Sequence, residues 1–254
     1  MKKVGVIGLG DMGSGLAKNL IQNGFETVGF DLSQKRMADF EAMGGNPTQD
    51  VKSVAQNATT VFLMVMTGEQ ANEVIFNSGG LAENLAKGSS IILTATIKPS
   101  EAKNLGKKLE EFDLHFIDSP VSGGYPGAQS GTLTIMAAGA EKALAENSDV
   151  MQAISKTIHI VGSKAGEGQT VKACLQSLIG SIFSATFEAA ALAAKAGISG
   201  EVLFNVFSTS GASSGVSNTA LENIIDRNFE GTGSHIATMH KDLTIVLDMA
   251  QDLG

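Results

Sequence analysis

The stretch Val4-Gly5-Val6-Ile7-Gly8-Leu9-Gly10-Asp11-Met12-Gly13 decides how the first part of the chain folds. Residues 4–8 form a short apolar run, which is typical of a buried strand. The run leads into the pattern GxGxxG, and a helical pattern over residues 14–22 follows. In such a unit the first glycine allows a tight turn, the second lets the backbone approach a pyrophosphate, and the third lets helix and strand pack closely. We therefore predict a dinucleotide-binding turn.

Strand and helix patterns continue to alternate up to residue 161. The predicted strands are 26–31, 60–66, 90–93, 114–118, 132–138 and 157–161, and helices are predicted at 34–43, 68–76, 98–112 and 141–155. Alternating strands and helices are typical of a largely parallel sheet covered on both faces. The fold class predicted for this part is α/β, with a doubly wound Rossmann-type sheet.

The strand pattern ends near residue 163. Residues 167–196 predict one helix of about 30 residues, roughly 45 Å long, and its richness in Ala, Leu and Ile indicates burial between domains or subunits. We predict a Rossmann domain over 1–163 and an all-helical domain over 164–254, with further helices at 201–207, 218–227 and 239–252. Because Gly254 falls at an apolar helix, we expect a C-terminal piece to be missing.

Composition excludes several classes of protein. The net charge of −8 over 254 residues argues against nucleic-acid binding, which requires a clustered basic excess. One cysteine, Cys174, excludes an intramolecular disulfide framework, and the four histidines show no metal-ligand spacing, so no metal site is expected. The longest uncharged helical stretch, 173–187, is shorter than the ~20 residues that span a bilayer. No cleavage site follows the N-terminal apolar run, so we expect a cytoplasmic protein without membrane contact.

The glycine turn has a matching acidic residue. The candidate cofactor-binding residues of the turn are Gly8, Leu9, Gly10, Asp11, Met12 and Gly13. Asp31 follows Gly8 by 23 residues at the end of the second predicted strand, which suits a contact with ribose hydroxyls. A carboxylate there repels a 2′-phosphate, so NAD is preferred over NADP, although Ser33, Lys35 and Arg36 could favour the phosphate. A turn without ligand, or a methyltransferase-type Rossmann domain, would explain the same pattern.

A second group of small residues follows the strand at 114–118. The sequence Asp118-Ser119-Pro120-Val121-Ser122-Gly123-Gly124 continues into further glycines up to Gly131. The backbone N–H groups of Ser122, Gly123 and Gly124 could form a concavity that binds a carboxylate. A wide loop or bulge without ligand is the alternative interpretation.

Lys172 and Gln176 form a third candidate pair. They lie four residues apart, so they share one face of the predicted long helix. A lysine and an amide on an otherwise apolar helix are unfavourable unless they line a cavity. A solvated lysine near a helix start is the alternative interpretation.

Together these segments resemble the β-hydroxyacid dehydrogenase family, also called 3-hydroxyisobutyrate dehydrogenase-like. The resemblance covers nearly the whole chain and rests on GLGDMGSGLAKNL at 8–20, DSPVSGGYPGAQSGTLTIMAAG at 118–139, GEGQTVKACLQ at 166–176 and KDL at 241–243. The family implies hydride transfer between NAD or NADP and a small β-hydroxy acid or sugar acid, in the threonate, glycerate or tartronate semialdehyde, or 3-hydroxyisobutyrate class. The nicotinamide cofactor carries the hydride chemistry, and the protein supplies orientation and the proton.

The resemblance also implies residue roles. Lys172 matches the catalytic lysine, a general acid/base whose pKa we expect burial or the positive nicotinamide to lower from about 10.4. Residues 122–124 match the substrate-carboxylate loop. The remaining matches are Thr96 and Lys241, near cofactor and substrate, and Val65 and Met66, where the family usually has Leu-Pro against the cofactor.

The main departure from the family pattern lies at Leu175-Gln176. Many members carry Asn-Asn there, with the second Asn on the substrate, whereas Gln176 resembles the branch that includes L-threonate dehydrogenases. The long apolar helix and the alanine-rich stretch 189–196 favour a homodimer or homotetramer. A non-catalytic cofactor-binding oligomer and an imine reductase are the alternative functions, and Lys172 argues against both.

Overall fold

The computed structural model describes residues 2–230, 232 and 235–254. The chain forms two compact units, residues 1–172 and 173–254, and the division falls inside the long helix α10 (Glu167–Lys195). The sequence placed its boundary after residue 163, where the last strand ends at Gly162.

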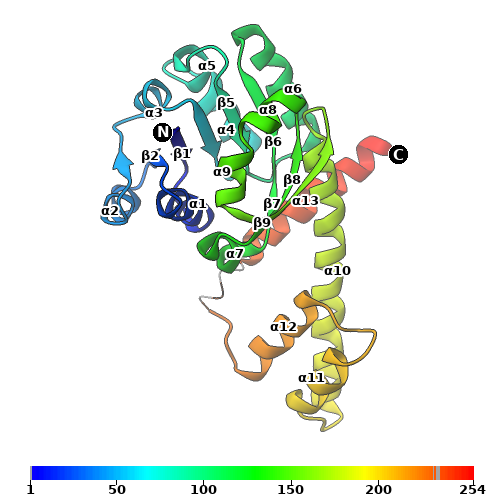
Figure 1. Ribbon diagram of the computed structural model, residues 1–254. Helices are drawn as coiled ribbons and strands as arrows, with labels where there is room; N and C mark the ends of the chain where they lie inside the picture. The colour runs from blue at the N-terminus through cyan, green and yellow to red at the C-terminus, as the bar shows by residue number, and fades with distance from the viewer. Residues whose placement is uncertain (1, 231, 233–234) are drawn as a thin grey trace. The chain divides into compact units, whose positions relative to one another are not determined.

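The first unit is built on one nine-stranded sheet with the order β3-β2-β1-β4-β5-β6-β8-β7, and β9 pairs with β8 (Figure 1). Strands β1 to β6 pair in parallel, whereas β8 runs antiparallel to β6 and β7 and parallel to β9. The strands are β1 (Lys3–Ile7), β2 (Glu26–Phe30), β3 (Asn46–Pro47), β4 (Thr60–Leu63), β5 (Ser90–Leu93), β6 (His115–Asp118), β7 (Val121–Ser122), β8 (Leu133–Ala138) and β9 (Ser155–Gly162).

Helices cover both faces of this sheet because successive strand side chains point to opposite faces. In β4, Phe62 packs into one hydrophobic core, and its neighbours Val61 and Leu63 pack into the other. The first core receives side chains of α1 (Asp11–Gln22), α2 (Gln34–Ala42), α7 (Gly124–Ser130), α8 (Glu141–Glu146) and α9 (Ser148–Ala153). The second receives those of α3 (Val51–Asn57), α4 (Gly68–Phe76), α5 (Leu81–Asn84) and α6 (Pro99–Leu109). The predicted doubly wound α/β class is confirmed.

Local predictions failed where elements are short or rich in glycine. The segment after Asp118, predicted to be a loop, contains β7 and α7. The predicted helix 141–155 is divided at Asn147, whose buried amide bonds Thr60, Ser90 and the carbonyl of Ala143. The amide thus satisfies polar groups at the amino ends of β4 and β5, a tertiary requirement that helical periodicity does not reveal.

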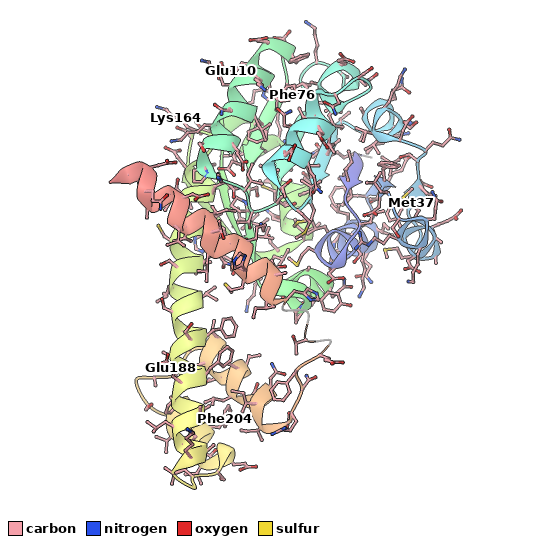
Figure 2. The ribbon with its side chains drawn as sticks, turned by 180° about the vertical axis from the view of Figure 1, so that it is seen from behind. Met37, Phe76, Glu110, Lys164, Glu188 and Phe204 are labelled. Carbon is pink, nitrogen blue, oxygen red and sulfur yellow. The ribbon has the colours of Figure 1, made fainter. Side chains whose placement is uncertain are left out.

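The second unit is helical, as predicted. It contains most of α10 together with α11 (Gly200–Ser208), α12 (Gly215–Ile225) and α13 (Ile236–Leu253). A Cβ at Gly180 would lie 2.9 Å from the side chain of Leu243, so α10 and α13 approach closely at this glycine. Within the single chain Phe187 and Leu192 of this helix are 51% and 71% exposed, so the predicted burial between domains or subunits stays a prediction. Figure 2 shows the side chains that project from α10 and α11, among them Glu188 and Phe204.

Gly15 is expected to be essential for the packing of α1 on α7. A Cβ there would lie 2.6 Å from the backbone carbonyl of Ala128, and backbone cannot move aside as a flexible side chain can. Gly15→Ala should therefore lower the free energy of unfolding by about 1–3 kcal/mol, measured by urea denaturation. Gly211→Ala is the control, since a Cβ at Gly211 meets no described atom within 4 Å. Equal stability of the two variants would contradict the tight contact.

Candidate active site

Most of the candidate residues in the first unit lie just beyond the carboxyl ends of its parallel strands. Gly8 follows β1, Asp31 follows β2, Val65 lies beyond β4, and Thr96 lies beyond β5. In open α/β sheets this edge is where ligands bind, because loops from neighbouring strands converge there.

The glycine turn allows contacts that no side chain would permit. A Cβ on Gly8, whose φ is +88°, would lie 2.1 Å from the carbonyl oxygen of Met64, and a Cβ on Gly13 would lie 1.8 Å from that of Gly8. At Gly10 the nearest atom to a Cβ is Nη2 of Arg36, 3.6 Å away, and no side chain caps α1 there. The first turn of α1 can therefore present its N–H groups to an anion.

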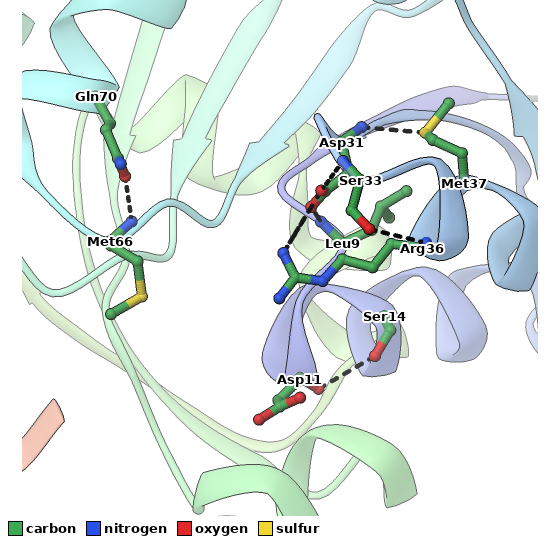
Figure 3. Close-up of polar contacts among 9 residues, drawn as sticks. All are labelled: Leu9, Asp11, Ser14, Asp31, Ser33, Arg36, Met37, Met66 and Gln70. Carbon is green, nitrogen blue, oxygen red and sulfur yellow. Dashed lines mark hydrogen bonds and ion pairs between the residues drawn. The ribbon is translucent and has the colours of Figure 1, made fainter. Parts of the chain in front are cut away.

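Asp31 is tied directly to this turn (Figure 3). Its Oδ2 accepts a hydrogen bond from the backbone N–H of Leu9 at 2.8 Å, and its Oδ1 accepts one from that of Ser33 at 2.8 Å. The guanidinium of Arg36 lies 3.4 Å from Oδ2. Both carboxylate oxygens are thus held, and the side chain is 8% exposed.

Two exposed apolar side chains lie on these loops. Met66, which the sequence placed against the cofactor, is 55% exposed, and its N–H donates to Oε1 of Gln70 at 2.9 Å (Figure 3). Leu32 is 91% exposed, and the sequence analysis did not identify it. Its position directly after Asp31 was the available signal. Exposed apolar side chains of this kind provide surface on which a flat base can pack.

The candidate carboxylate loop is joined to the glycine turn. Ser122 ends β7, Gly123 has a φ of +128°, and Gly124, with a φ of +57°, begins α7. From α7 the amide of Gln129 donates to the carbonyl oxygen of Asp11, with a separation of 3.3 Å, and lies 3.3 Å from the hydroxyl of Ser14. The structure therefore brings the second sequence motif next to the first.

A buried carboxylate lies at the end of β6. The oxygen Oδ2 of Asp118 accepts from the N–H of Gly166 at 2.8 Å and from that of Gln169 at 3.2 Å. Its Oδ1 accepts from the side-chain amide of Gln169 at 2.8 Å. Asp118 is fully buried, and burial raises the pKa of this carboxyl to about 6, against the opposing effect of its hydrogen bonds with residues 166–169.

Gln169 links this carboxylate to the segment that carries Thr96. Its amide nitrogen also donates to the carbonyl oxygen of Ala95 at 3.0 Å, and its amide oxygen accepts from the N–H of Ile97 at 3.0 Å. Lys172 follows three residues later on α10 and is 6% exposed, so the lysine is not the solvated residue of the alternative interpretation. Sequence reasoning missed both Asp118 and Gln169 as contributors, although both lie inside quoted motifs.

In the second unit Asp242 joins two candidate residues. Its Oδ2 accepts a 2.6 Å hydrogen bond from the amide nitrogen of Gln176, and its Oδ1 lies 3.0 Å from Nζ of Lys241. Gln176 is 7% exposed and Asp242 is 5% exposed. The sequence named Gln176 and Lys241 but gave no role to Asp242, whose only signal was its place between Lys241 and Leu243.

No cluster of three His, Cys, Asp or Glu side chains suited to a metal ion occurs among the described residues. The polar candidate residues are instead amides, hydroxyls and carboxylates, with Lys172 in the first unit and Lys241 in the second.

Comparisons with known proteins match both units. Residues 3–162 match the family model for the NAD-binding domain of 6-phosphogluconate dehydrogenase, and residues 166–254 match that of NADP-dependent 3-hydroxyisobutyrate dehydrogenase. L-threonate dehydrogenase of Escherichia coli K12 is 32% identical over 98% of this chain and 83% of its own length. Mitochondrial 3-hydroxyisobutyrate dehydrogenase of Rattus norvegicus is 31% identical over 97% and 75%. A solved 3-hydroxyisobutyrate dehydrogenase from Salmonella typhimurium has a TM-score of 0.90 and 30% identity, covering 100% of this chain and 88% of that one.

The raised pKa of Asp118 predicts how stability depends on pH. Between pH 4 and pH 6 the native carboxyl keeps its proton, whereas the unfolded carboxyl, with a pKa of 3.8, has lost it. This group therefore makes the free energy of unfolding fall as the pH rises through that window, by about 3 kcal/mol in total. Urea titrations from pH 4 to pH 7 should show wild type losing stability relative to Asp118→Asn. A flat or rising difference would contradict the shift.

Proposed function

This chain belongs to the 3-hydroxyisobutyrate dehydrogenase-like family of NAD(P)-dependent β-hydroxyacid dehydrogenases, and on that premise we propose that its substrate is a small sugar acid and that Lys172 is its general acid/base. The chain is an oxidoreductase that transfers a hydride between a nicotinamide cofactor and a small hydroxy acid. The observation that carries the proposed role is a buried lysine one turn beyond the Asp118–Gln169 hydrogen bonds.

The glycine turn fits the dinucleotide by its shape. Backbone carbonyls occupy the space that a Cβ on Gly8 or Gly13 would need, and Gly10 leaves the start of α1 open to a diphosphate. We assign the diphosphate to residues 8–13, a ribose to Asp31, and the surfaces beyond β4 and β5 to Val65, Met66 and Thr96. The bound cofactor supplies the site that accepts or donates the hydride.

Lys172 handles the proton of the reacting hydroxyl. In oxidation, its neutral amine takes the hydroxyl proton as the carbinol becomes a carbonyl. In reduction, the ammonium returns a proton to the carbonyl oxygen. Positioned proton transfer of this kind contributes ~10²–10⁴-fold to rate. The same lysine argues against a non-catalytic module or an imine reductase.

We place the substrate carboxylate on the backbone N–H groups of Ser122, Gly123 and Gly124, because the positive φ angles of the two glycines turn the chain at this point. Gln176 is assigned to a second polar group of the substrate, and Lys241 to the cofactor or substrate nearby. Gln176 already donates to Asp242, and this polar pair at the substrate favours hydroxylated ligands, because a site built to hydrogen-bond a hydroxyl rejects an analogue that lacks it. The proposed substrate is therefore threonate or glycerate rather than 3-hydroxyisobutyrate.

We also propose that the enzyme is a cytoplasmic homo-oligomer that associates through its second unit. The residues of α11 are apolar in part, yet none is buried within the chain, and Val202 and Val206 are each more than half exposed. By length and composition alone α10 would also suffice to cross a membrane. Exposed Glu188 within its apolar half favours a protein partner over lipid, since charges facing lipid are strongly disfavoured.

Asp31 should make NAD the preferred cofactor. Its carboxylate repels a 2′-phosphate and pairs with Arg36. Asp31→Ser removes the repulsion and releases the guanidinium, so the ratio of kcat/KM for NADP over NAD should rise at least about tenfold. Adding Arg36→Ala should reverse the gain. Adding Lys35→Ala should not, because the wild-type Lys35 ammonium pairs with Asp39 instead. Wild-type efficiency with NADP equal to that with NAD would contradict the prediction.

Lys172→Ala should lower kcat about 10²–10⁴-fold while cofactor affinity changes little. Lys172→Arg should not restore turnover, because guanidinium does not lose its proton near neutral pH. Steady-state kinetics with threonate, glycerate and 3-hydroxyisobutyrate would test both the lysine and the substrate class, with cofactor titration as the folding control. Near-wild-type turnover in Lys172→Ala, or a larger loss in Lys241→Ala, would show that a different lysine acts.

Charge placed on the exposed face of the second unit should weaken association. Val202→Glu combined with Val206→Glu should shift the mass measured by light scattering after size exclusion towards the monomer, because buried carboxylates are destabilising. Ile160→Glu, which alters an equally exposed apolar residue on β9, should leave the mass unchanged. A wild-type protein that is monomeric at micromolar concentration would rule the interface out.

A further inference from the structure

Asp118 is a buried ionisable group that the reaction described above does not use. It ends β6, and its carboxylate accepts three hydrogen bonds, one from Gly166 just before α10 and two from Gln169 in its first turn. We infer that Asp118 is a positioning residue, which acts through Gln169 to fix the turn of Lys172 against the segment that carries Thr96. This inference rests on the proposed role of Lys172.

Three hydrogen bonds fix the orientation of the Gln169 amide. Its nitrogen donates to two acceptors, Asp118 and the carbonyl of Ala95, and its oxygen accepts from the N–H of Ile97. Rotating the amide by half a turn would reverse all three contacts and set its oxygen against the carboxylate. A carboxylate has no proton to donate when ionised, so Asp118 admits only one orientation of the amide.

The oriented amide of Gln169 positions the backbone around Thr96. The bonds to Ala95 and Ile97 hold the backbone on either side of Thr96, which follows β5. Gln169 and Lys172 are three residues apart on one helix, and such residues lie on the same face. One side chain therefore connects the segment around Thr96 to the helical turn that carries the lysine.

The start of α10 packs closely against neighbouring backbone, which leaves little room for adjustment. A Cβ on Gly168 would lie 2.7 Å from the carbonyl oxygen of Met136 and 2.8 Å from that of Asp118. A Cβ on Gly166, whose φ is +94°, would lie 2.7 Å from the carbonyl oxygen of Pro99. Backbone is in contact with backbone here, so side chains cannot rearrange to compensate for a lost hydrogen bond to Asp118. The helical turn itself would then have to shift.

The hydrogen-bond pattern also requires a carboxyl at position 118. A hydroxyl or an amide would cap a helix start without an ionisable group, and desolvation makes this carboxyl the more costly choice. Burial raises its pKa, as described above. Only an acceptor on both oxygens satisfies two N–H groups and the amide together, which accounts for a carboxyl at this position.

The test is a double-mutant cycle on Asp118 and Gln169, with turnover and stability measured on the same proteins. Asp118→Asn places an NH₂ group against the NH₂ group of Gln169, and Gln169→Glu places two carboxyls against each other. In the double variant the asparagine can donate to the glutamate, while the glutamate can still accept from Ile97. Each single variant should lose about tenfold to 10²-fold in kcat, with a smaller rise in the Kd for the cofactor, because the residues assigned to its diphosphate and ribose are unchanged. The double variant should recover part of that loss.

Asn147→Ala is the matched control. Asn147 is 2% exposed and makes three side-chain hydrogen bonds, to Thr60, Ser90 and Ala143, at the opposite ends of the strands. Its loss should lower Tm without changing kcat, because none of its partners touches the lysine. Assays well below the lowest Tm separate damage to stability from damage to positioning.

The outcomes distinguish this inference from the proposed function. If Lys172→Ala loses turnover but Asp118→Asn keeps it while Tm falls, Asp118 is only structural and the inference fails alone. If Asn147→Ala loses as much kcat as Asp118→Asn, general destabilisation explains both losses, and the inference again fails. If Lys172→Ala keeps its turnover, the proposed function fails and the positioning role fails with it.

Discussion

Close backbone packing at the carboxyl end of β1 is the constraint on which the site depends. Because Gly13 lets α1 lie against the carbonyl of Gly8, the helix start is held at the edge of the sheet. The same helix approaches α7 through Gly15, and α7 begins at the candidate carboxylate loop. The glycine turn and the candidate carboxylate loop are therefore set by one helix, and their separation does not depend on mobile side chains.

Hydrogen bonding to carboxylates supplies the second level of order. Asp31, Asp118 and Asp242 each accept hydrogen bonds from groups inside the quoted motifs: the backbone of Leu9, the amide of Gln169, and the amide of Gln176. In each case the acid fixes the direction in which a neighbouring polar group is presented. A site assembled in this way has its orientation built in before a ligand arrives, which reduces the reorganisation needed during the reaction.

Sequence alone predicted the parts of the site whose signal is local. The glycine turn and Asp31 were found because strand, turn and acid lie within one βαβ unit of fixed spacing. Asp118 with Gln169 and Gln176 with Asp242 were not paired, because 51 and 66 residues separate the partners. The helix α7 was missed because glycine and proline favour turns locally, and its contacts with α1 override that preference. For α10 the composition predicted burial, but an apolar composition does not tell which surface covers the helix.

The two compact units share one uninterrupted helix, with the division at Lys172. In an α-helix the carbonyls of residues 169–172 accept from N–H groups four residues further along, which here belong to the second unit. A fragment that ended at residue 172 would keep the glycine turn and Asp31. The backbone carbonyls of its last helical turn, which bears Lys172, would lack the N–H groups that donate to them in the whole chain. The helical turn that bears Lys172 is thus completed by backbone of the second unit, whereas the glycine turn and Asp31 are held by hydrogen bonds and contacts within the first.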